Sequence, residues 1–177
     1  MTPINEPTAQ VSDTTKMTKE QKGHQLIIYT DGAARGNPGP GGYGAVLLWG
    51  DKRKELSGGF RLTTNNRMEL LAVIAALRSL TKKNISVSIY TDSQYVVNSV
   101  EKKWLDNWIK TDFKGGKKNK DLWLQYHAVA KHFKIRFYWV RGHADNVMNI
   151  RCDELATAAA DGKNLLIDEG YEEAINN

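Results

Sequence analysis

The sequence has few of the features that mark secreted and membrane proteins. Cys152 is the only cysteine, which excludes an internal disulfide and favours a reducing cytoplasm as the location. Paired cysteines and His-x-x-x-His spacing are both missing, so a structural zinc site is not expected. No apolar run approaches the roughly 18 residues that cross a bilayer. We therefore expect a cytoplasmic protein without a membrane partner.

The first two dozen residues lack what a targeting segment needs. They contain neither arginine nor an apolar stretch, and they carry scattered acids. This composition predicts a disordered tail over residues 1–24 rather than a secretory or transit peptide. The remaining length suits one domain with a full hydrophobic core, expected over residues 25–162. Residues 163–177 are expected to form an acidic tail, and the default expectation is a monomer.

The net charge of +5 is unevenly distributed along the chain. Acids gather near the carboxyl end, while lysines crowd one stretch in the second half: Lys102, Lys103, Lys110, Lys114, Lys117, Lys118 and Lys120. A one-sided basic patch is typical of proteins that bind a nucleic-acid backbone. A lysine-rich loop that is simply solvated would also account for the pattern.

Apolar periodicity predicts a mixed sheet of five strands connected in part by helices. The strands are expected at residues 25–30, 43–49, 53–61, 85–90 and 135–140. Short glycine and charged connections make the first three strands an antiparallel meander. Helices are expected at residues 66–80, 93–100 with a continuation over 102–109, 120–133, and finally 150–160. The order predicts a mixed α/β (α+β) fold.

A glycine motif between the first two strands resembles a dinucleotide-binding fingerprint. Residues 39–44 fit G-x-G-x-x-G, but that site needs a helix to follow, whose amino end holds the pyrophosphate. Here an alternating, strand-like pattern follows, and prolines remove backbone donors. A rigid turn over residues 36–42 that carries Asn37 near Asp31 is the better interpretation.

The tripeptide Tyr-Thr-Asp occurs twice, ending at Asp31 and at Asp92, each time after an apolar strand. If these strands are parallel neighbours, the two carboxylates converge at one edge of the sheet. At about 4 Å they repel by roughly 4 kcal/mol for an effective dielectric near 20, so a divalent cation is expected between them. Alternatively, Asp31 starts a turn and Asp92 caps the next helix. The repetition favours a metal-dependent enzyme.

Glu69 is a third candidate carboxylate, in the first turn of a helix that is apolar almost all round. Residues 66–69 fit a capping box, in which Glu69 would reach back to cap the helix at Asn66. If the helix packs against the first and fourth strands, its amino end would instead aim Glu69 at Asp31 and Asp92.

The last predicted helix offers two further acids, Asp153 and Glu154. Periodicity places its inner face at Cys152, Leu155, Ala156 and Ala159, and either acid borders that face. The pattern does not choose between them, and acids near a helix start are also favoured by the macrodipole.

Five motifs, taken together and in order, closely resemble the bacterial type I ribonucleases H. They lie at residues 29–32 with 36–44, 64–70, 91–96, 139–144 and 151–156, so that the resemblance covers residues 25–162. It implies a ribonuclease H-like fold, with an antiparallel first half of the sheet and helices on both faces.

The resemblance also implies the chemistry and the residues that perform it. The activity would be endonucleolytic hydrolysis of the RNA strand of RNA–DNA hybrids, leaving 5′-phosphate and 3′-hydroxyl ends. Two Mg²⁺ ions, with Mn²⁺ as a possible substitute, would be bound by Asp31, Glu69, Asp92 and Asp153, which resolves the choice between Asp153 and Glu154. His143 would be an auxiliary catalytic group that moves protons or aids product release.

The substrate contacts implied by the resemblance are mostly amides and lysines. Amide side chains suit the RNA 2′-hydroxyl, which both donates and accepts hydrogen bonds. The implied contacts are Asn37, Asn65, Asn66 and Gln94 at the 2′-hydroxyls, Thr64 and Asn119 at a DNA phosphate, Trp104 in a groove, and Lys117 and Lys118 in a basic protrusion.

Other functions were weighed against the nuclease. The main alternative is a non-catalytic hybrid-binding module on the same fold, which the repulsive carboxylates disfavour because a binder has no need of them. A domain of a larger replication or reverse-transcription assembly and a nucleotide-cofactor enzyme are further alternatives. The basic protrusion weighs against the first of these, and the strand after the glycine motif weighs against the second.

Overall fold

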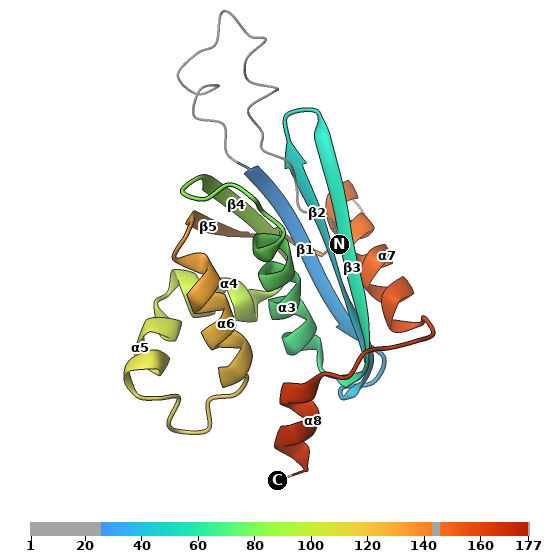
Figure 1. The fold of residues 1–177 in the computed structure, drawn as a ribbon, viewed down its shortest axis with the longest axis vertical. Helices are drawn as coiled ribbons and strands as arrows, with labels where there is room; N and C mark the ends of the chain where they lie inside the picture. The colour runs from blue at the N-terminus through green and yellow to red at the C-terminus, as the bar shows by residue number, and fades with distance from the viewer. Residues whose placement is uncertain (1–25, 143–145, 177) are drawn as a thin grey trace, which may run out of the picture.

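The computed structural model describes residues 26–142 and 146–176 (Figure 1). The elements run in the order β1 (Leu26–Ala34), β2 (Gly39–Trp49), β3 (Lys52–Thr63), α3 (Asn65–Arg78), β4 (Ser86–Thr91), α4 (Gln94–Glu101), α5 (Trp104–Lys110), α6 (Lys120–Ala130), β5 (Lys134–Trp139), α7 (Val147–Ala160) and α8 (Glu169–Ile175). Among these, no helix has the length and apolar character that a bilayer span requires.

The five strands form one mixed sheet in the order β3-β2-β1-β4-β5. The pairs β1–β2 and β2–β3 are antiparallel, whereas β1–β4 and β4–β5 are parallel. This topology confirms the predicted mixed sheet with an antiparallel first half. It also confirms that the strands leading to Asp31 and Asp92 are parallel neighbours.

Helices cover both faces of the sheet (Figure 1). On β2, alternate glycines show which helix lies on each face. A Cβ at Gly41 would meet Met68 of α3, whereas one at Gly42 or Gly44 would meet the backbone of α7. The close approach of α7 to β2 therefore depends on positions without side chains. It brings α7, with Asp153, to the face opposite α3.

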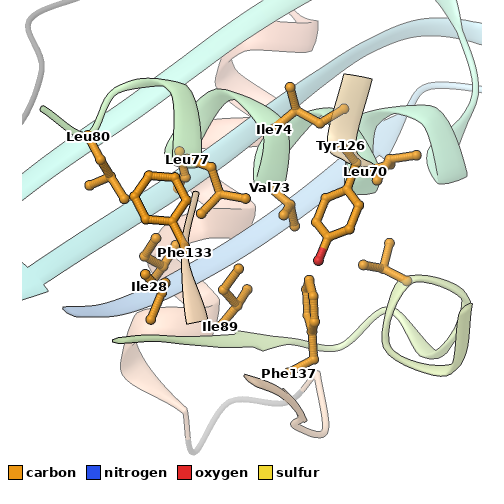
Figure 2. Close-up of a cluster of buried hydrophobic side chains, with 14 of the residues drawn as sticks. Ile28, Leu70, Val73, Ile74, Leu77, Leu80, Ile89, Tyr126, Phe133 and Phe137 are labelled. Atoms are coloured by element: carbon orange, nitrogen blue, oxygen red, sulfur yellow. The ribbon is translucent and has the colours of Figure 1, made fainter. Parts of the chain in front are cut away.

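The main core lies between the sheet and α3 (Figure 2). Ile28, Ile89 and Phe137 stand side by side on β1, β4 and β5 and are buried against α3. The apolar positions of α3 that fill this layer include Leu70, Val73, Ile74 and Leu77. Each side chain of this size stabilises the fold by about 1.5–3 kcal/mol when buried. The packing therefore fixes where the amino end of α3 lies relative to the strands.

Three local predictions differ from the structure. The predicted turn over residues 36–42 is shorter, because β2 already begins at Gly39; the glycine motif does lead into a strand, as predicted. β1 continues to Ala34, so Asp31 lies inside the strand rather than beyond its end. The expected continuation of α4 is a separate helix, α5, because Lys103 adopts a left-handed backbone with φ 64°.

The helix predicted over residues 150–160 is confirmed as part of α7, but it is not the final helix. The acidic segment at the carboxyl end folds onto the domain and forms α8. Leu166 bonds the free edge of β3, donating to Gly59 O at 3.0 Å and accepting from Arg61 N at 2.9 Å. α8 follows, near the amino end of α3 (Figure 1). Its cap, Asp168, is buried against Arg67. The predicted tail at residues 1–24 lies outside the described residues.

Candidate metal centre

Three carboxylates meet at the end of the central strands. Asp31 comes from β1, Asp92 directly follows β4, and Glu69 lies in α3; ligand oxygens of the three lie within 4.8 Å of one another. The parallel register pairs Thr30 with Thr91, so the next residue of each strand is an aspartate. The predicted convergence of Asp31 and Asp92 follows directly from this pairing.

Glu69 reaches the cluster because α3 packs directly against β1. A Cβ on Gly32 would collide with the backbone of Met68 and Glu69, so only glycine permits this approach. The helix is capped by Thr64, which accepts from Arg67 N at 3.3 Å. The predicted capping box at Asn66 is therefore wrong. Because the cap lies two residues before Asn66, Glu69 is not at the position from which a capping box reaches back, and it bonds Ser93 and joins the carboxylates instead.

The carboxylates of the cluster are partly shielded from solvent, which makes their negative charges costly. Burial, and then the charge of Asp92, raise the pKa of Asp31 well above its usual range, and burial raises the pKa of Glu69 to about 7. Gly32 N donates to Asp31 Oδ1 at 2.8 Å, and Ser93 Oγ donates to Glu69 Oε1 at 2.9 Å. Both donors are neutral groups, so neither offsets the negative charge of the carboxylates. Converging oxygen ligands with unrelieved charge fit a hard divalent cation.

Asp153 lies beside this cluster but is not part of the three-residue group. It is exposed on α7, and its charge adds to the rise in the pKa of Asp31 and Asp92. Glu154 instead accepts from Arg151 Nη1 at 3.2 Å. The assignment of Asp153 as a fourth ligand stays a prediction. His143 falls in residues 143–145, outside the described residues.

Sequence reasoning missed several residues that shape the site. Trp139 Nε1 donates to the backbone oxygen of Asp92 at 3.0 Å. A Cβ at Gly142 would collide with the Asp92 carboxylate. Ser93, not Asp92, caps α4 by accepting from Val96 N at 3.1 Å. For Ser93 the sequence did offer a signal, because a serine that directly follows the second aspartate at the start of a helix is a typical N-cap.

Two predicted substrate residues join the loops around the cluster. Asn37 Oδ1 accepts from Asn65 N at 3.1 Å, and Asn65 Oδ1 accepts from Ala34 N at 2.6 Å. Asn66 is exposed in the first turn of α3, and Gln94 is exposed at the start of α4. Asn65 and Asn66 therefore lie on α3 with Glu69, while Asn37 follows β1 and Gln94 lies two residues after Asp92. Their roles stay predictions.

The other predicted substrate residues lie at the start of α3, on α5 and before α6. Thr64 caps α3, and Asn119 precedes α6, where its Nδ2 donates to Tyr95 Oη at 3.1 Å. Trp104 is 43% exposed on α5, with Lys102 Nζ 5.6 Å from its ring centroid. Lys117 and Lys118 are exposed between α5 and α6. The structure thus leaves the basic stretch open to solvent.

Comparison with known proteins identifies the family. The family model for RNase H matches residues 23–161, which is more than half of the chain. The chain belongs to the RNase H family. Its relatives include the ribonuclease H of Syntrophus aciditrophicus (strain SB), 53% identical over 151 residues that cover 83% of this chain and 87% of the relative. That of Aeromonas salmonicida (strain A449) is 52% identical over 151 residues, 83% of this chain and 97% of the relative.

Solved RNase H structures share the fold. The crystal structure of LC9-RNase H1, a type 1 RNase H with the type 2 active-site motif, superposes with a TM-score of 0.70 and 28% identity over 87% of this chain and 82% of that one. LC11-RNase H1, solved in complex with an RNA/DNA hybrid, gives 0.61 and 28% over 77% and 97%. These relatives and the bacterial ribonucleases H support the bacterial type I assignment. The family uses divalent metal ions, and the three-carboxylate cluster fits them.

Proposed function

We propose that this chain is a Mg²⁺-dependent endoribonuclease that hydrolyses the RNA strand of RNA–DNA hybrids and leaves 5′-phosphate and 3′-hydroxyl ends. The observation that carries the proposal is the meeting of Asp31, Glu69 and Asp92 within 4.8 Å in a chain of the RNase H family. A hybrid-binding module has no use for such a repulsive cluster, whereas a metal-dependent nuclease requires one.

The protein's own groups have distinct tasks in this reaction. Asp31, Glu69 and Asp92 would hold two Mg²⁺ ions, or Mn²⁺ in their place, with Asp153 contributing from α7. Such ions supply an activated water and charge stabilisation at the leaving 3′ oxygen. The carboxylates are held in place by the packing of β1, β4 and α3, so their orientation is set before substrate arrives. His143 would move a proton or aid product release.

Substrate selection would rest on the amides that surround the carboxylates. The side-chain oxygens of Asn37 and Asn65 already accept backbone hydrogen bonds, which leaves their NH₂ groups to donate to an acceptor such as the 2′ oxygen. Asn66 and Gln94 would add contacts from α3 and α4, Thr64 and Asn119 would hold a DNA-strand phosphate, and Trp104 would line a groove. The solved LC11-RNase H1 complex with an RNA/DNA hybrid supports this class of substrate. A monomer and a cytoplasmic location stay predictions.

A gel assay tests the function directly. The purified chain is incubated with labelled RNA–DNA hybrid, single-stranded RNA or duplex RNA, each with Mg²⁺ or with EDTA. We expect cutting of the hybrid alone, only with Mg²⁺, and products with 5′-phosphate ends. Tight binding of the hybrid without cutting would favour the binding module, and cutting that persists in EDTA would contradict the metal assignment.

The lysines between α5 and α6 are expected to bind the nucleic-acid backbone. Replacing Lys117 and Lys118 with glutamine should weaken hybrid binding and lower the slope of log affinity against log salt by about 0.9 for each phosphate that is no longer neutralised. Binding is measured by fluorescence anisotropy at several salt concentrations, in an Asp31→Asn background that prevents cleavage. The matched control replaces Lys52 and Lys131, which are also exposed but lie away from the carboxylates. An equal loss of affinity in both double variants would contradict a localised binding surface.

Gly32 is expected to be needed for both stability and activity. In Gly32→Ala the new methyl group meets the backbone of Met68 and Glu69, so α3 must shift away from β1. We expect a loss of about 1–3 kcal/mol in unfolding free energy from overpacking. Hydrolysis should fall by about 10²-fold, because a shift of about 1 Å misplaces Glu69. Gly162→Ala, whose added methyl would lie 3.2 Å from Ala159 O, is the control for urea unfolding and activity. Near-normal activity of Gly32→Ala would refute this role.

A further inference from the structure

Ser93 connects the carboxylate cluster to the start of α4. It is 3% exposed, and its Oγ lies 2.9 Å from Glu69 Oε1 and 3.1 Å from Val96 N. Its backbone N also donates to Thr91 Oγ1 at 3.1 Å, which fixes the residue where β4 ends. Ser93 is thus bonded to β4 through its backbone and to α4 and the Glu69 carboxylate through its side chain.

The direction of these hydrogen bonds gives the hydroxyl a single use for its proton. Val96 N is a donor, so Ser93 Oγ accepts from it with one lone pair. A hydroxyl has only one proton to donate, and the carboxylate oxygen of Glu69 is an acceptor in reach. Capping α4 therefore orients the hydroxyl, and the oriented hydroxyl donates to Glu69.

Glu69 needs such a partner more than the aspartates do. Its side chain has one more rotatable bond than that of aspartate, and it reaches the cluster from a helix rather than from the strands themselves. The aspartates are placed by the β1–β4 register, whereas Glu69 Oε1 is held by a side chain from a different element. Without that partner, the Glu69 carboxylate is free to take other rotamers.

We propose that Ser93 is a positioning residue of the metal site, which holds the Glu69 carboxylate where it meets Asp31 and Asp92. This inference rests on the proposed function and extends it to a residue outside the three-carboxylate cluster. Partners that orient metal ligands in this way typically change metal affinity or activity by about 10–100-fold when removed. A purely structural cap would affect the stability of α4 and leave metal affinity unchanged.

Four variants separate positioning from capping. Ser93→Ala removes both hydrogen bonds of the hydroxyl, while Ser93→Gly removes the hydroxyl but keeps a residue that is well tolerated at an N-cap. Ser93→Thr keeps a hydroxyl that can cap and donate. The matched control is Ser99→Ala, because Ser99 is also buried in α4 and its Oγ donates at 2.6 Å to a backbone oxygen, that of Tyr95.

The first measurement is Mn²⁺ binding to each full-length protein by isothermal titration calorimetry without nucleic acid. We expect Ser93→Ala and Ser93→Gly to raise the Mn²⁺ dissociation constant about tenfold, with Ser93→Thr and Ser99→Ala near the unmodified protein. The second is hybrid hydrolysis against Mg²⁺ concentration, in which the half-maximal concentration should rise by a similar factor while the KM for hybrid stays unchanged.

Three results would overturn the inference. Unchanged Mn²⁺ affinity in both Ser93→Ala and Ser93→Gly would show that Glu69 does not depend on Ser93. An equal shift in Ser99→Ala would assign the effect to α4 as a whole. If the unmodified chain neither bound Mn²⁺ nor cut the hybrid, both the proposed function and this inference would be refuted. If the unmodified chain bound and cut normally and the Ser93 variants were unaffected, only this inference would be refuted.

Discussion

Replacing Asp31 with asparagine is expected to abolish hydrolysis of the hybrid while leaving hybrid binding largely intact. Asp31 belongs to the carboxylate cluster and is only 6% exposed, so water can do little to take its place as a ligand when the charge is removed. Asparagine keeps the shape of the side chain but supplies only a neutral oxygen to a cation. We expect the rate to fall by about 10³-fold or more, as when a preorganised electrostatic group is removed. Gel assays and anisotropy with the same hybrid measure the two effects separately.

The same substitution should stabilise the metal-free protein above neutral pH. Burial and the neighbouring Asp92 raise the pKa of Asp31 above its value in the unfolded chain. Between those two pKa values the folded state binds more protons than the unfolded state, so stability falls as pH rises. Asparagine removes this loss, and each kcal/mol recovered raises the melting temperature by about 2–4 °C in a chain of this size. The gain should be full above the raised pKa and absent near pH 3.

Asp51→Asn is the matched control for both measurements. Asp51 is exposed in the turn between β2 and β3, at the end of the sheet opposite the carboxylates. It should leave cleavage and melting temperature unchanged in EDTA at pH 8. Strong cleavage by Asp31→Asn would refute the metal assignment. A melting temperature that fell in Asp31→Asn would contradict the electrostatic strain described for the cluster.

Replacing Asp168 with asparagine is expected to lower the free energy of unfolding by about 3 kcal/mol, the cost of leaving a buried charge without its partner. The side chains of Arg67 and Asp168 are only 4% and 8% exposed. Arg67 Nε and Nη2 donate to the two Asp168 oxygens at 2.8 and 2.9 Å, and Thr63 Oγ1 donates at 2.7 Å. Arg67 keeps its second partner, Asp121, which places the loss at the lower end of the range for broken buried pairs.

Glu172→Gln provides the control for this experiment. It removes the same charge from the same segment, but its partner Arg61 is 56% exposed, so the pair should contribute only about 0–1 kcal/mol. Urea unfolding of the full chain, followed by circular dichroism, measures both variants. Equal losses in the two variants would show that burial of the Arg67–Asp168 pair has no special weight.

The sheet and two of its carboxylates were accessible from the sequence. Apolar runs ending in Tyr-Thr-Asp predict two strands that lead to Asp31 and Asp92. Their carboxylates were expected to converge if the two strands were parallel neighbours, and the structure shows that they are. The glycine motif was also interpreted correctly as leading into a strand, because alternation after Gly42 outweighs the match to a dinucleotide fingerprint. These features could be predicted because the periods of strands and helices depend only on residues that are close together in the sequence.

Glu69 shows where local patterns fail. Residues 66–69 satisfy a capping box, yet the helix is capped at Thr64 and Glu69 bonds Ser93. The local sequence is compatible with either arrangement, Glu69 reaching back to a cap at Asn66 or Glu69 pointing to the carboxylates. Which of them forms depends on the packing of α3 against β1 at Gly32, a contact between elements 30 or more residues apart in the chain.

The carboxyl-terminal segment marks the same limit. By itself the sequence determined the order of the five strands along the chain, the elements that carry the candidate carboxylates and the positions of the basic residues, since each follows from the period and composition of neighbouring residues. The tertiary structure alone decided that Asp168 anchors α8 and that Ser93 bonds Glu69. Those hydrogen bonds join residues 101 and 24 positions apart. The burial that makes it costly to remove one partner of such a pair exists only once the chain has folded.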